Sequence, residues 1–257
     1  MNAPHPVTTH PVATVTPPDL PTLGVVLPVW NDPDGLADIL GHLRAPVDAC
    51  EVIEVVVADA SADDRCQRVA RAATDAGMPV RYVHCDRPNR GAQLNAGAAR
   101  AAAELLLFHH VDVPLTVEHC RAARVAAARP GFSAGAYYRK FDPVHRRRQW
   151  LEGFVRAYNR RGGALYGDQS LFILKRSFDA HGGFRDIALM EDVEFTLRLR
   201  RNGGIELVDP PVLPSARRHA KRGSLRTSLF NVWITAAFRM GVSPDTLHRW
   251  YYGRRKK

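Results

Sequence analysis

Four short apolar runs in the first 110 residues have the length and composition of strands that are buried on both faces of a sheet. They are 23–29 (LGVVLPV), 52–58 (VIEVVVA), 80–84 (VRYVH) and 104–110 (ELLLFHH). Segments with helical character lie between them, at 35–43, 63–76 and 92–103. Because strands that alternate with helices form right-handed crossovers, the pattern predicts an α/β fold with a mainly parallel, Rossmann-like sheet flanked by helices.

The second half of the chain has a different pattern. After Pro130, the stretch FSAGAYYRK is followed by a helical stretch near 146–160 and by the Gly-rich segment YGDQSLFILK. From residue 214 onward the chain is strongly basic, and its apolar stretch at 228–238 is too short to cross a membrane. We expect a disordered N-terminal tail at 1–22 and a single domain at 23–257, because no Pro-rich linker divides the rest of the chain.

Residues 189–201, LMEDVEFTLRLRR, allow two interpretations. The strict alternation of apolar residues from Val193 to Leu199 indicates a strand. The Leu, Glu and Arg content, the acids ahead of the run and the glycine after it favour a helix, which we expect. The positive end of the helix dipole then favours ionised Glu191 and Asp192 and keeps one of them available as a proton acceptor, although the same effect explains an ordinary helix start.

Composition limits the class of protein. The 257 residues are 46% hydrophobic, which is typical of a folded soluble protein, and the formal net charge of +10 indicates an anionic partner. That partner is a nucleic acid, a membrane surface or a phosphorylated small molecule. The four cysteines lie far apart without a Cys-x-x-Cys pair, so we expect neither a zinc site nor disulfides, as in a reducing cytoplasm. The N-terminus lacks the basic start and apolar core of a signal peptide.

The carboxyl ends of the predicted strands are the candidate ligand site, because ligands bind there in open parallel sheets. These ends read PVWND, ADASADD, CDRPNRGAQLNAG and HHVDV. All four contain an Asp, and the third adds Arg87 and Arg90. Such a mixture can hold a nucleotide diphosphate through a cation and basic side chains.

His110 and Asp112 are two residues apart and would point the same way on an extended chain, whereas His109 would face the opposite side. An imidazole and a carboxylate suit Mn²⁺ or Mg²⁺ when phosphates complete the coordination shell. The alternative is that the histidines end the strand and Asp112 caps the next turn. Asp59 likewise is either a base or ribose acceptor or a turn former, and Arg90 either reaches a phosphate or lies on the surface.

Taken in order, these segments resemble an inverting family 2 glycosyltransferase of the GT-A fold. The matching segments span about residues 23–208 and are VVLPVWND, VVVADASADD, RGAQLNAGAARA, LLLFHHVDV, YGDQSLFILKRSFDAHGGF and LMEDVEFTLRLRRNG. The resemblance is closest to a bacterial subgroup labelled transferase 2, rSAM/selenodomain-associated, whose tail extends the match to about residue 252. It implies a nucleotide-sugar-binding half at 23–115, a mixed acceptor and catalytic half at 116–213 and a basic helical tail at 214–257.

The resemblance also implies roles for individual residues. Asp192 would be the general base with Glu191 beside it, and Asp59 would contact the nucleotide base. Asp112 would bind the divalent cation, Mn²⁺ or Mg²⁺, with His110 in place of the first acid of the usual D-x-D. The other expected nucleotide-binding residues are Pro28, Val29, Trp30, Asn31, Arg90, Gln93, Asn95 and Val111. Residues expected on the acceptor side are Gly167, Asp168 and Gln169, and those expected at the diphosphate are Arg217, Arg218 and Lys221.

These roles predict a direct displacement, in which the base deprotonates an acceptor hydroxyl that attacks the anomeric carbon and inverts it. The expected donor is a UDP- or GDP-sugar, and the acceptor is an unidentified hydroxyl compound, lipid-linked acceptors included. We expect Asp59, Asp112 and Asp192 to share one pocket. We expect a cytoplasmic protein whose C-terminal helices either contact a membrane peripherally or pair two copies of the chain.

Other classes of protein fit the sequence less well. A nucleotidyltransferase would need a basic, Gly-rich segment near the first strand, which PVWNDPDG lacks. A nucleic-acid-binding protein would gather bases and aromatics on one surface, whereas acids at strand ends repel phosphate without a cation, so we expect no nucleic-acid partner. Membrane binding through Trp233, Phe238, Trp250 and Tyr251 beside the basic C-terminus stays open as an alternative to core or dimer packing of these aromatics.

Overall fold

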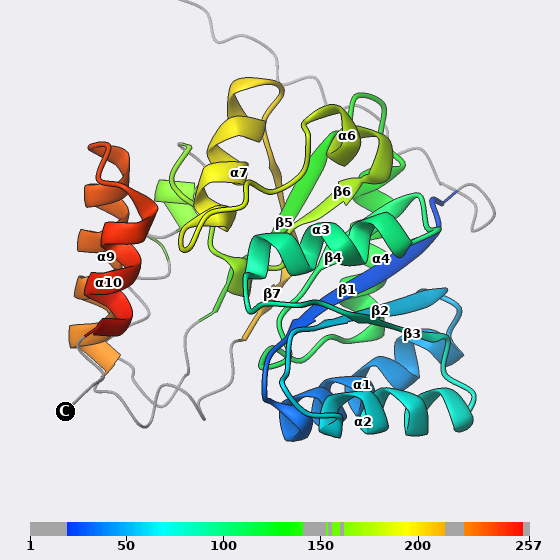
Figure 1. The fold of residues 1–257 in the computed structure, drawn as a ribbon. Helices are drawn as coiled ribbons and strands as arrows, with labels where there is room; N and C mark the ends of the chain where they lie inside the picture. The colour runs from blue at the N-terminus through cyan, green and yellow to red at the C-terminus, as the bar shows by residue number, and fades with distance from the viewer. Residues whose placement is uncertain (1–19, 141–152, 154–155, 160–161, 214–223, 254–257) are drawn as a thin grey trace, which may run out of the picture.

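One mostly parallel sheet forms the centre of the molecule (Figure 1). The computed structural model describes residues 20–140, 153, 156–159, 162–213 and 224–253. In this part of the chain the strands are β1 (Leu23–Val29), β2 (Glu54–Asp59), β3 (Val80–His84), β4 (Leu105–Phe108), β5 (Ala134–Arg139), β6 (Phe172–Leu174) and β7 (Glu206–Val212). They pair in the order β3-β2-β1-β4-β6-β5-β7, and only β6 among them runs antiparallel to its neighbours. The predicted α/β fold is confirmed.

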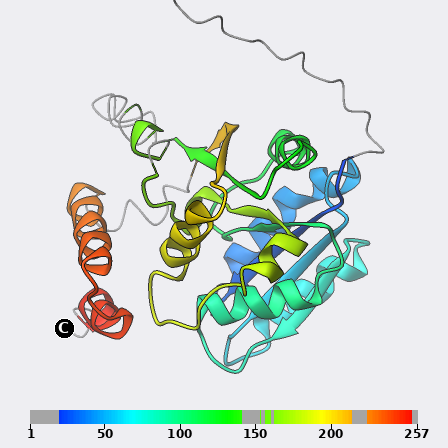
Figure 2. The same cartoon turned by 90° about the horizontal axis from the view of Figure 1, so that it is seen from above.

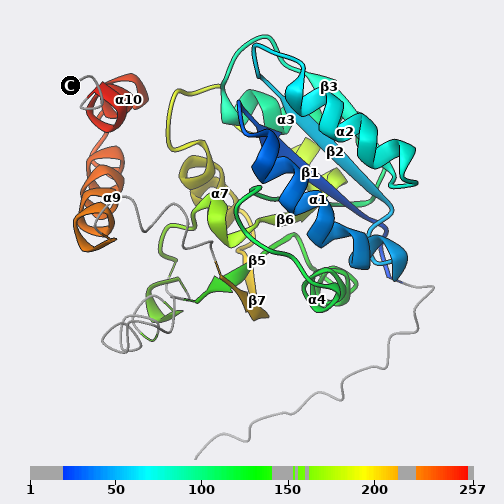
Figure 3. The ribbon, with the colours of Figure 1, turned by 90° about the horizontal axis from the view of Figure 1, so that it is seen from below.

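Helices cover both faces of this sheet. Their bounds are α1 (Pro33–Asp48), α2 (Arg65–Asp75), α3 (Arg90–Arg100), α4 (Val117–Ala127), α6 (Lys175–Ala180), α7 (Glu191–Arg201), α9 (Ser224–Arg239) and α10 (Pro244–Tyr252), with a 3-10 turn η3 at Gly167–Gln169. Val25 and Leu27 of β1 belong to a core shared with α1, α2 and α4, the side that Figure 3 shows from below. Val26 faces α3, α6 and α7, which Figure 2 shows from above. Both faces are therefore buried, as the continuous apolar runs predict.

Side-chain caps begin several helices immediately after strand ends. Asp32 accepts the N–H of Gly35 at 3.0 Å ahead of α1, and Asn89 accepts the N–H of Ala92 at 2.9 Å ahead of α3. Such caps stabilise a helix by about 1 kcal/mol each. Because these caps fix where α1 and α3 begin, the loops that follow β1 and β3 at the carboxyl edge of the sheet are held in place.

The segment with alternating apolar residues is the helix α7, as expected. Its apolar side chains enter two different cores. Phe195 lies among the sheet-facing aromatics, with ring centroids 5.6 Å from Phe178 and 4.6 Å from Phe184. Val193 and Leu197 pack instead against the C-terminal helices. A helix that is buried on two sides needs apolar residues on both, which explains a spacing that imitates a strand.

The C-terminal helices α9 and α10 lie beside α7, on the side away from β1, β2 and β3 (Figures 1 and 3). Among the described residues, no helix combines the length and apolar character needed to cross a membrane. Of the helix predicted near 146–160, residues 156–159 are helical and most of the rest lies outside the described residues. The predicted N-terminal tail lies outside them too, except for residues 20–22.

Candidate functional site

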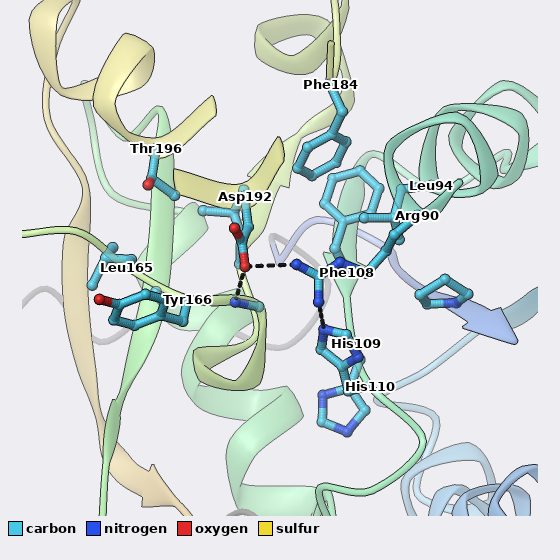
Figure 4. A pocket seen from close by; sticks show the side chains of 14 residues that line it. Arg90, Leu94, Phe108, His109, His110, Leu165, Tyr166, Phe184, Asp192 and Thr196 are labelled. Carbon is cyan, nitrogen blue, oxygen red and sulfur yellow. Dashed lines mark hydrogen bonds and ion pairs between the residues drawn. The ribbon is translucent and has the colours of Figure 1, made fainter. Parts of the chain in front are cut away.

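Arg90, the first residue of α3, contacts three side chains from two other segments, and Figure 4 shows two of these contacts, those with Asp192 and His110. Its Nε donates to Oε1 of Glu191, and its Nη2 donates to Oδ2 of Asp192 over 2.8 Å. Its Nη1 lies 3.1 Å from Nε2 of His110. A guanidinium has no acceptor, so Nε2 of His110 is the acceptor and the imidazole proton lies on Nδ1. The guanidinium thus joins the end of β4 to the first turn of α7.

Charge and burial set the protonation of this cluster. Burial raises the pKa of Glu191, an effect that Arg90 opposes and Asp192 reinforces. Burial lowers the pKa of Arg90, but Glu191 and Asp192 outweigh it, so that the pKa of Arg90 is raised overall. Arg90 is therefore a permanent cation here. It stabilises negative charge on two adjacent carboxyl groups that would otherwise repel each other.

Asp192 is held by three donors. Its Oδ2 accepts the backbone N–H of Gly167 at 2.7 Å in addition to Arg90, and its Oδ1 accepts the N–H of Val193 at 2.7 Å within α7. Gly167 is required by close packing, because a Cβ on it would collide with Nε2 of His110. The carboxylate therefore has a fixed orientation without a substrate.

A small cavity that is partly open to solvent begins at this cluster (Figure 4). Asp192, Arg90 and His110 lie at its polar end. Apolar side chains form most of its walls, among them Leu94, Phe108, Leu165 and Phe184. Of the described residues that line it, Asp192 is the one with a carboxylate. The sequence predicts one pocket for three acids, but Asp59 and Asp112 are not among the residues that line this cavity.

Asp59 lies at the end of β2, fully buried, in a separate network of hydrogen bonds. Its Oδ1 accepts from the N–H and the hydroxyl of Ser61, at 2.9 and 2.5 Å, and its Oδ2 accepts from the hydroxyl of Tyr82 at 2.9 Å. The Ser61 hydroxyl also accepts the N–H of Asn31 at 2.7 Å. Burial, together with Asp59, raises the pKa of Tyr82, which keeps that hydroxyl a donor. The network ties together the ends of β1, β2 and β3.

The turn after β4 differs from the expected geometry. The strand ends at Phe108, and residues 110–113 form a turn in which the N–H of Val113 lies 3.3 Å from the carbonyl of His110. The argument that His110 and Asp112 point the same way on an extended chain is therefore wrong. His109 is buried, with Nδ1 2.7 Å from the Ser170 hydroxyl and Nε2 2.6 Å from the Val113 carbonyl, so it supports this turn.

Comparison with known proteins identifies the family. The model of glycosyl transferase family 2 matches residues 24–184, well over half of the chain. The chain belongs to glycosyl transferase family 2. No curated protein sequence matches it significantly.

Solved structures share the GT-A fold of this glycosyltransferase. A mannosyltransferase from Pyrobaculum calidifontis, in complex with GDP-Man and Mn²⁺, is 18% identical with a TM-score of 0.65, over 91% of this chain and 70% of that one. Residues 1–349 of TarS from S. aureus are 14% identical with a TM-score of 0.58, over 91% and 73% of the two chains. The same TarS fragment in complex with UDP has a TM-score of 0.56 at 16% identity, over 76% and 60%. At these identities the likeness shows the fold.

Two of the predicted nucleotide-binding residues, Gln93 and Asn95, form hydrogen bonds with the protein backbone. Gln93 is buried, and its amide donates to the carbonyls of Val29 and Ala58, at 2.7 and 2.9 Å. Asn95 exchanges two hydrogen bonds with the backbone of Phe184, at 2.8 and 2.9 Å. These contacts hold α3 against the sheet and against the loop before α7. Their roles at a nucleotide remain predictions.

The remaining predicted residues fall into three groups. Val29 and Val111 are buried in the core, whereas Trp30 is exposed at the sheet edge and Pro28 lines the cavity. On the expected acceptor side, Asp168 forms an ion pair with Arg139 at 3.0 Å, and Gln169 is buried and donates to the Tyr137 carbonyl at 3.2 Å. The expected diphosphate residues Arg217, Arg218 and Lys221 lie outside the described residues.

Two residues at the site were not predicted from the sequence. Tyr166 lines the cavity, and its hydroxyl lies 3.0 Å from that of Thr235 in α9. Ser61 orients Asp59. Both residues lie in segments that the sequence singles out, since Tyr166 directly precedes Gly167 and Ser61 lies inside ADASADD. A Tyr or a Ser has no evident role there until the hydrogen bonds to Thr235 and Asp59 are seen.

Proposed function

We propose that this glycosyltransferase moves a sugar from a nucleotide-sugar donor to an acceptor hydroxyl with inversion, and that Asp192 is the general base. One observation carries the proposal. Among the described residues that line the cavity, Asp192 is the one with a carboxylate, and hydrogen bonds from Arg90 and from the N–H of Gly167 fix the orientation of that carboxylate. A base must lie within hydrogen-bond reach of the proton that it removes, so a preoriented carboxylate at a cavity is suited to the task.

The reaction is a single displacement. An acceptor hydroxyl donates to a carboxylate oxygen of Asp192, and its proton moves to that oxygen as the hydroxyl oxygen bonds to the anomeric carbon. The bond from that carbon to the donor phosphate breaks, and the nucleoside diphosphate leaves with the electron pair. Arg90 and the positive end of the α7 dipole place positive charge beside the Asp192 carboxylate that receives this proton.

We propose that the donor is a nucleoside-diphosphate sugar at the carboxyl edge of the sheet, with Asp59 at the base. The neighbouring structures with GDP-Man and with UDP support this ligand class. The position of Asp59 at the end of β2 supports the assignment, since nucleotides bind beyond the strand ends of such sheets.

A divalent cation fits the site when the donor supplies most of its ligands. The described residues contain no group of three or more His, Cys, Asp or Glu side chains able to hold a metal. Asp112 is the proposed protein ligand, and Mn²⁺ in the mannosyltransferase complex supports a cation. Nε2 of His110 accepts from Arg90 in this arrangement, so we assign His110 to that contact in place of the cation. When bound, the cation would offset negative charge on the leaving diphosphate.

We further propose membership of the transferase 2, rSAM/selenodomain-associated subgroup. Four sequence elements support this assignment: QLNAGA at 93–98, HHVD at 109–112, GDQ at 167–169 and MEDVE at 190–194.

A thermal-shift panel tests the donor and the base together. UDP-, GDP- and dTDP-sugars, with and without Mn²⁺, are added to the wild type, Asp112→Ala, Asp192→Asn and the surface control Asp179→Asn. We expect one sugar nucleotide to stabilise the wild type and Asp192→Asn, and the Mn²⁺-dependent part to be lost in Asp112→Ala. Release of nucleoside diphosphate should fall at least about 100-fold in Asp192→Asn alone. No stabilisation by any donor would refute the proposed donor class, and normal turnover in Asp192→Asn would remove Asp192 from its role.

A further inference from the structure

The α9–α10 hairpin buries one face against the rest of the protein and exposes the other. Ile234, Ala237 and Leu247 are buried in a core with Met190 and Val193 at the start of α7. Thr235 on the same face reaches Tyr166 of the cavity. The opposite face of the hairpin is exposed, although Arg239 donates to the hydroxyl of Tyr158 over 3.4 Å.

That opposite face forms an exposed ridge of apolar and aromatic side chains. Ten large hydrophobic residues of the described chain are exposed, and half of them belong to this hairpin. Val232 in α9 is 63% exposed, and Met240, which directly follows the last residue of α9, is 77% exposed. The rings of Trp233 and Trp250 stack with centroids 5.0 Å apart, which joins the exposed faces of the two helices into one ridge.

The net charge of the chain is concentrated in the part of the sequence that contains this hairpin. Residues 214–257 contain eleven Lys and Arg and one Asp, a net charge of +10 that equals that of the whole chain. Residues 1–213 contain 25 basic and 25 acidic side chains and are neutral overall. Exposed Arg239 and Arg249 lie in the hairpin itself, beside the apolar ridge. An anionic partner would therefore be attracted to the C-terminal part of the chain, to which Arg239 and Arg249 belong.

We propose that the exposed ridge of α9–α10 docks on an anionic lipid surface. Trp and Tyr favour the interface between headgroups and acyl chains, and flanking Lys and Arg add attraction to anionic lipids. A second copy of the chain fits less well, because pairing would bring two segments of net charge +10 together. Nucleic acid fits less well because Val232 and Met240, the two most exposed large side chains of the ridge, are aliphatic and do not stack on bases, whereas the rings of Trp233 and Trp250 stack on each other.

Docking of the hairpin would place the cavity close to the lipid surface. The link is short, since Thr235 of α9 contacts Tyr166, which lines the cavity and adjoins Gly167. This inference about the acceptor rests on the proposed function. If the cavity lies close to the lipid surface, the acceptor hydroxyl belongs to an amphiphile embedded in that surface.

Vesicle sedimentation with the full chain tests the docking. Wild type is mixed with neutral phosphatidylcholine vesicles or with vesicles containing phosphatidylglycerol, at low and high salt, and with free glycerol phosphate as the headgroup alone. We expect binding to the anionic vesicles, weakened by salt and unaffected by glycerol phosphate. Val232→Glu/Met240→Glu should weaken it about tenfold or more, and Arg239→Glu/Arg249→Glu should do the same. Matched controls on other surfaces, Ile53→Glu and Arg71→Glu, should bind like the wild type.

Each other outcome overturns the proposal. Equal binding by the ridge variants and the wild type would mean that charge alone attracts vesicles. A dimer that Val232→Glu/Met240→Glu dissociates, without vesicle binding, would identify a second copy as the occupant. Retention on single-stranded DNA that is lost in the ridge variants, again without vesicle binding, would identify nucleic acid. Thermal shifts with sugar nucleotides, measured without vesicles, show whether the proposed donor site fails separately.

Discussion

The backbone N–H of Gly167 donates to Oδ2 of Asp192 over 2.7 Å. This bond connects the 3-10 turn η3 to the first turn of α7, two segments that are adjacent in space although 25 residues apart in sequence. The orientation of the proposed base therefore depends on a backbone group outside its own helix.

Substitution of Gly167 by Ala should lower transfer about 100-fold or more in a protein that still folds. The new Cβ would collide with Nε2 of His110 and lie 3.3 Å from Oδ2 of Asp192, so at least one of these groups must move. Displacement of a catalytic group by about 1 Å has consequences of that size. Initial rates of nucleoside diphosphate release measure the effect.

Gly41→Ala is the matched control. A Cβ at Gly41, inside α1, meets no atom within 4 Å, so Ala should retain the rate and stabilise the helix by up to about 1 kcal/mol. Wild-type rates in both Ala variants would show that the close packing at Gly167 is not needed.

Removal of Arg90 alone should destabilise the protein more than removal of Arg90 and Glu191 together. Arg90→Leu leaves the buried Glu191 carboxylate without its cation, at a cost of about 3 kcal/mol, whereas Arg90→Leu/Glu191→Leu should recover most of that loss. The free energy of unfolding in urea measures both. Arg68→Leu, which breaks the exposed pair with Asp64, should change little. Additive losses in the double variant would contradict the coupling.

His119 should make stability depend on pH. Burial lowers the pKa of this imidazole below its ordinary value of 6.5, so the unfolded chain binds the proton more readily. The stabilisation from neutral His119 is therefore complete above pH 6.5 and is lost as the pH falls below it. His119→Gln keeps an acceptor for the N–H of Thr116 without a titrating group. Its free energy of unfolding should fall less than that of the wild type between about pH 7.5 and about pH 5; an equal fall would exclude His119 as the cause.

The four cysteines should react with a thiol reagent at very different rates. Cys50 is exposed, whereas Cys66 and Cys120 are buried, and burial raises the pKa of Cys66 and raises that of Cys120 to about 12. Since the thiolate is the reactive form, Cys50 should react first and the two buried thiols only on unfolding. Cys50→Ser should abolish the fast phase. Rapid labelling of Cys120 in the folded protein would show that α4 is not packed as described.

The parallel strands of the first half of the chain could be predicted because each strand is determined by its own short stretch of sequence. β1 and β3 have the expected bounds, since an apolar run bounded by polar turns determines a buried strand. Three-residue β6, which alone among the described strands opposes its neighbours, carries too short a pattern to reveal its direction. The expected strand end at 110 was two residues too long, because His109 turns inward to Ser170 and the chain leaves the sheet.

Arg90, His110 and Asp192 at the polar end of the cavity were among the predicted residues, but the contacts between them could not be predicted. Arg90 and Glu191 are 101 positions apart, and nothing in either segment indicates that one guanidinium joins both acids. The assignment of Arg90 to a phosphate followed from its place in a strand-end loop, whereas the fold presents it to Glu191 and Asp192. A polar residue at the edge of a sheet either binds a ligand or forms hydrogen bonds and ion pairs within the protein. The sequence pattern is the same in the two cases.

The backbone contacts of Gln93 and Asn95 have a practical consequence for mutant screens. Both residues lie in a motif typical of donor binding, so loss-of-function variants at either position would be assigned to substrate recognition by default. Since the two amides hold strand ends and the loop before α7, their variants should behave as temperature-sensitive alleles, active in cool-grown cells and inactive in warm ones. Variants at Asp192 should be inactive at every growth temperature.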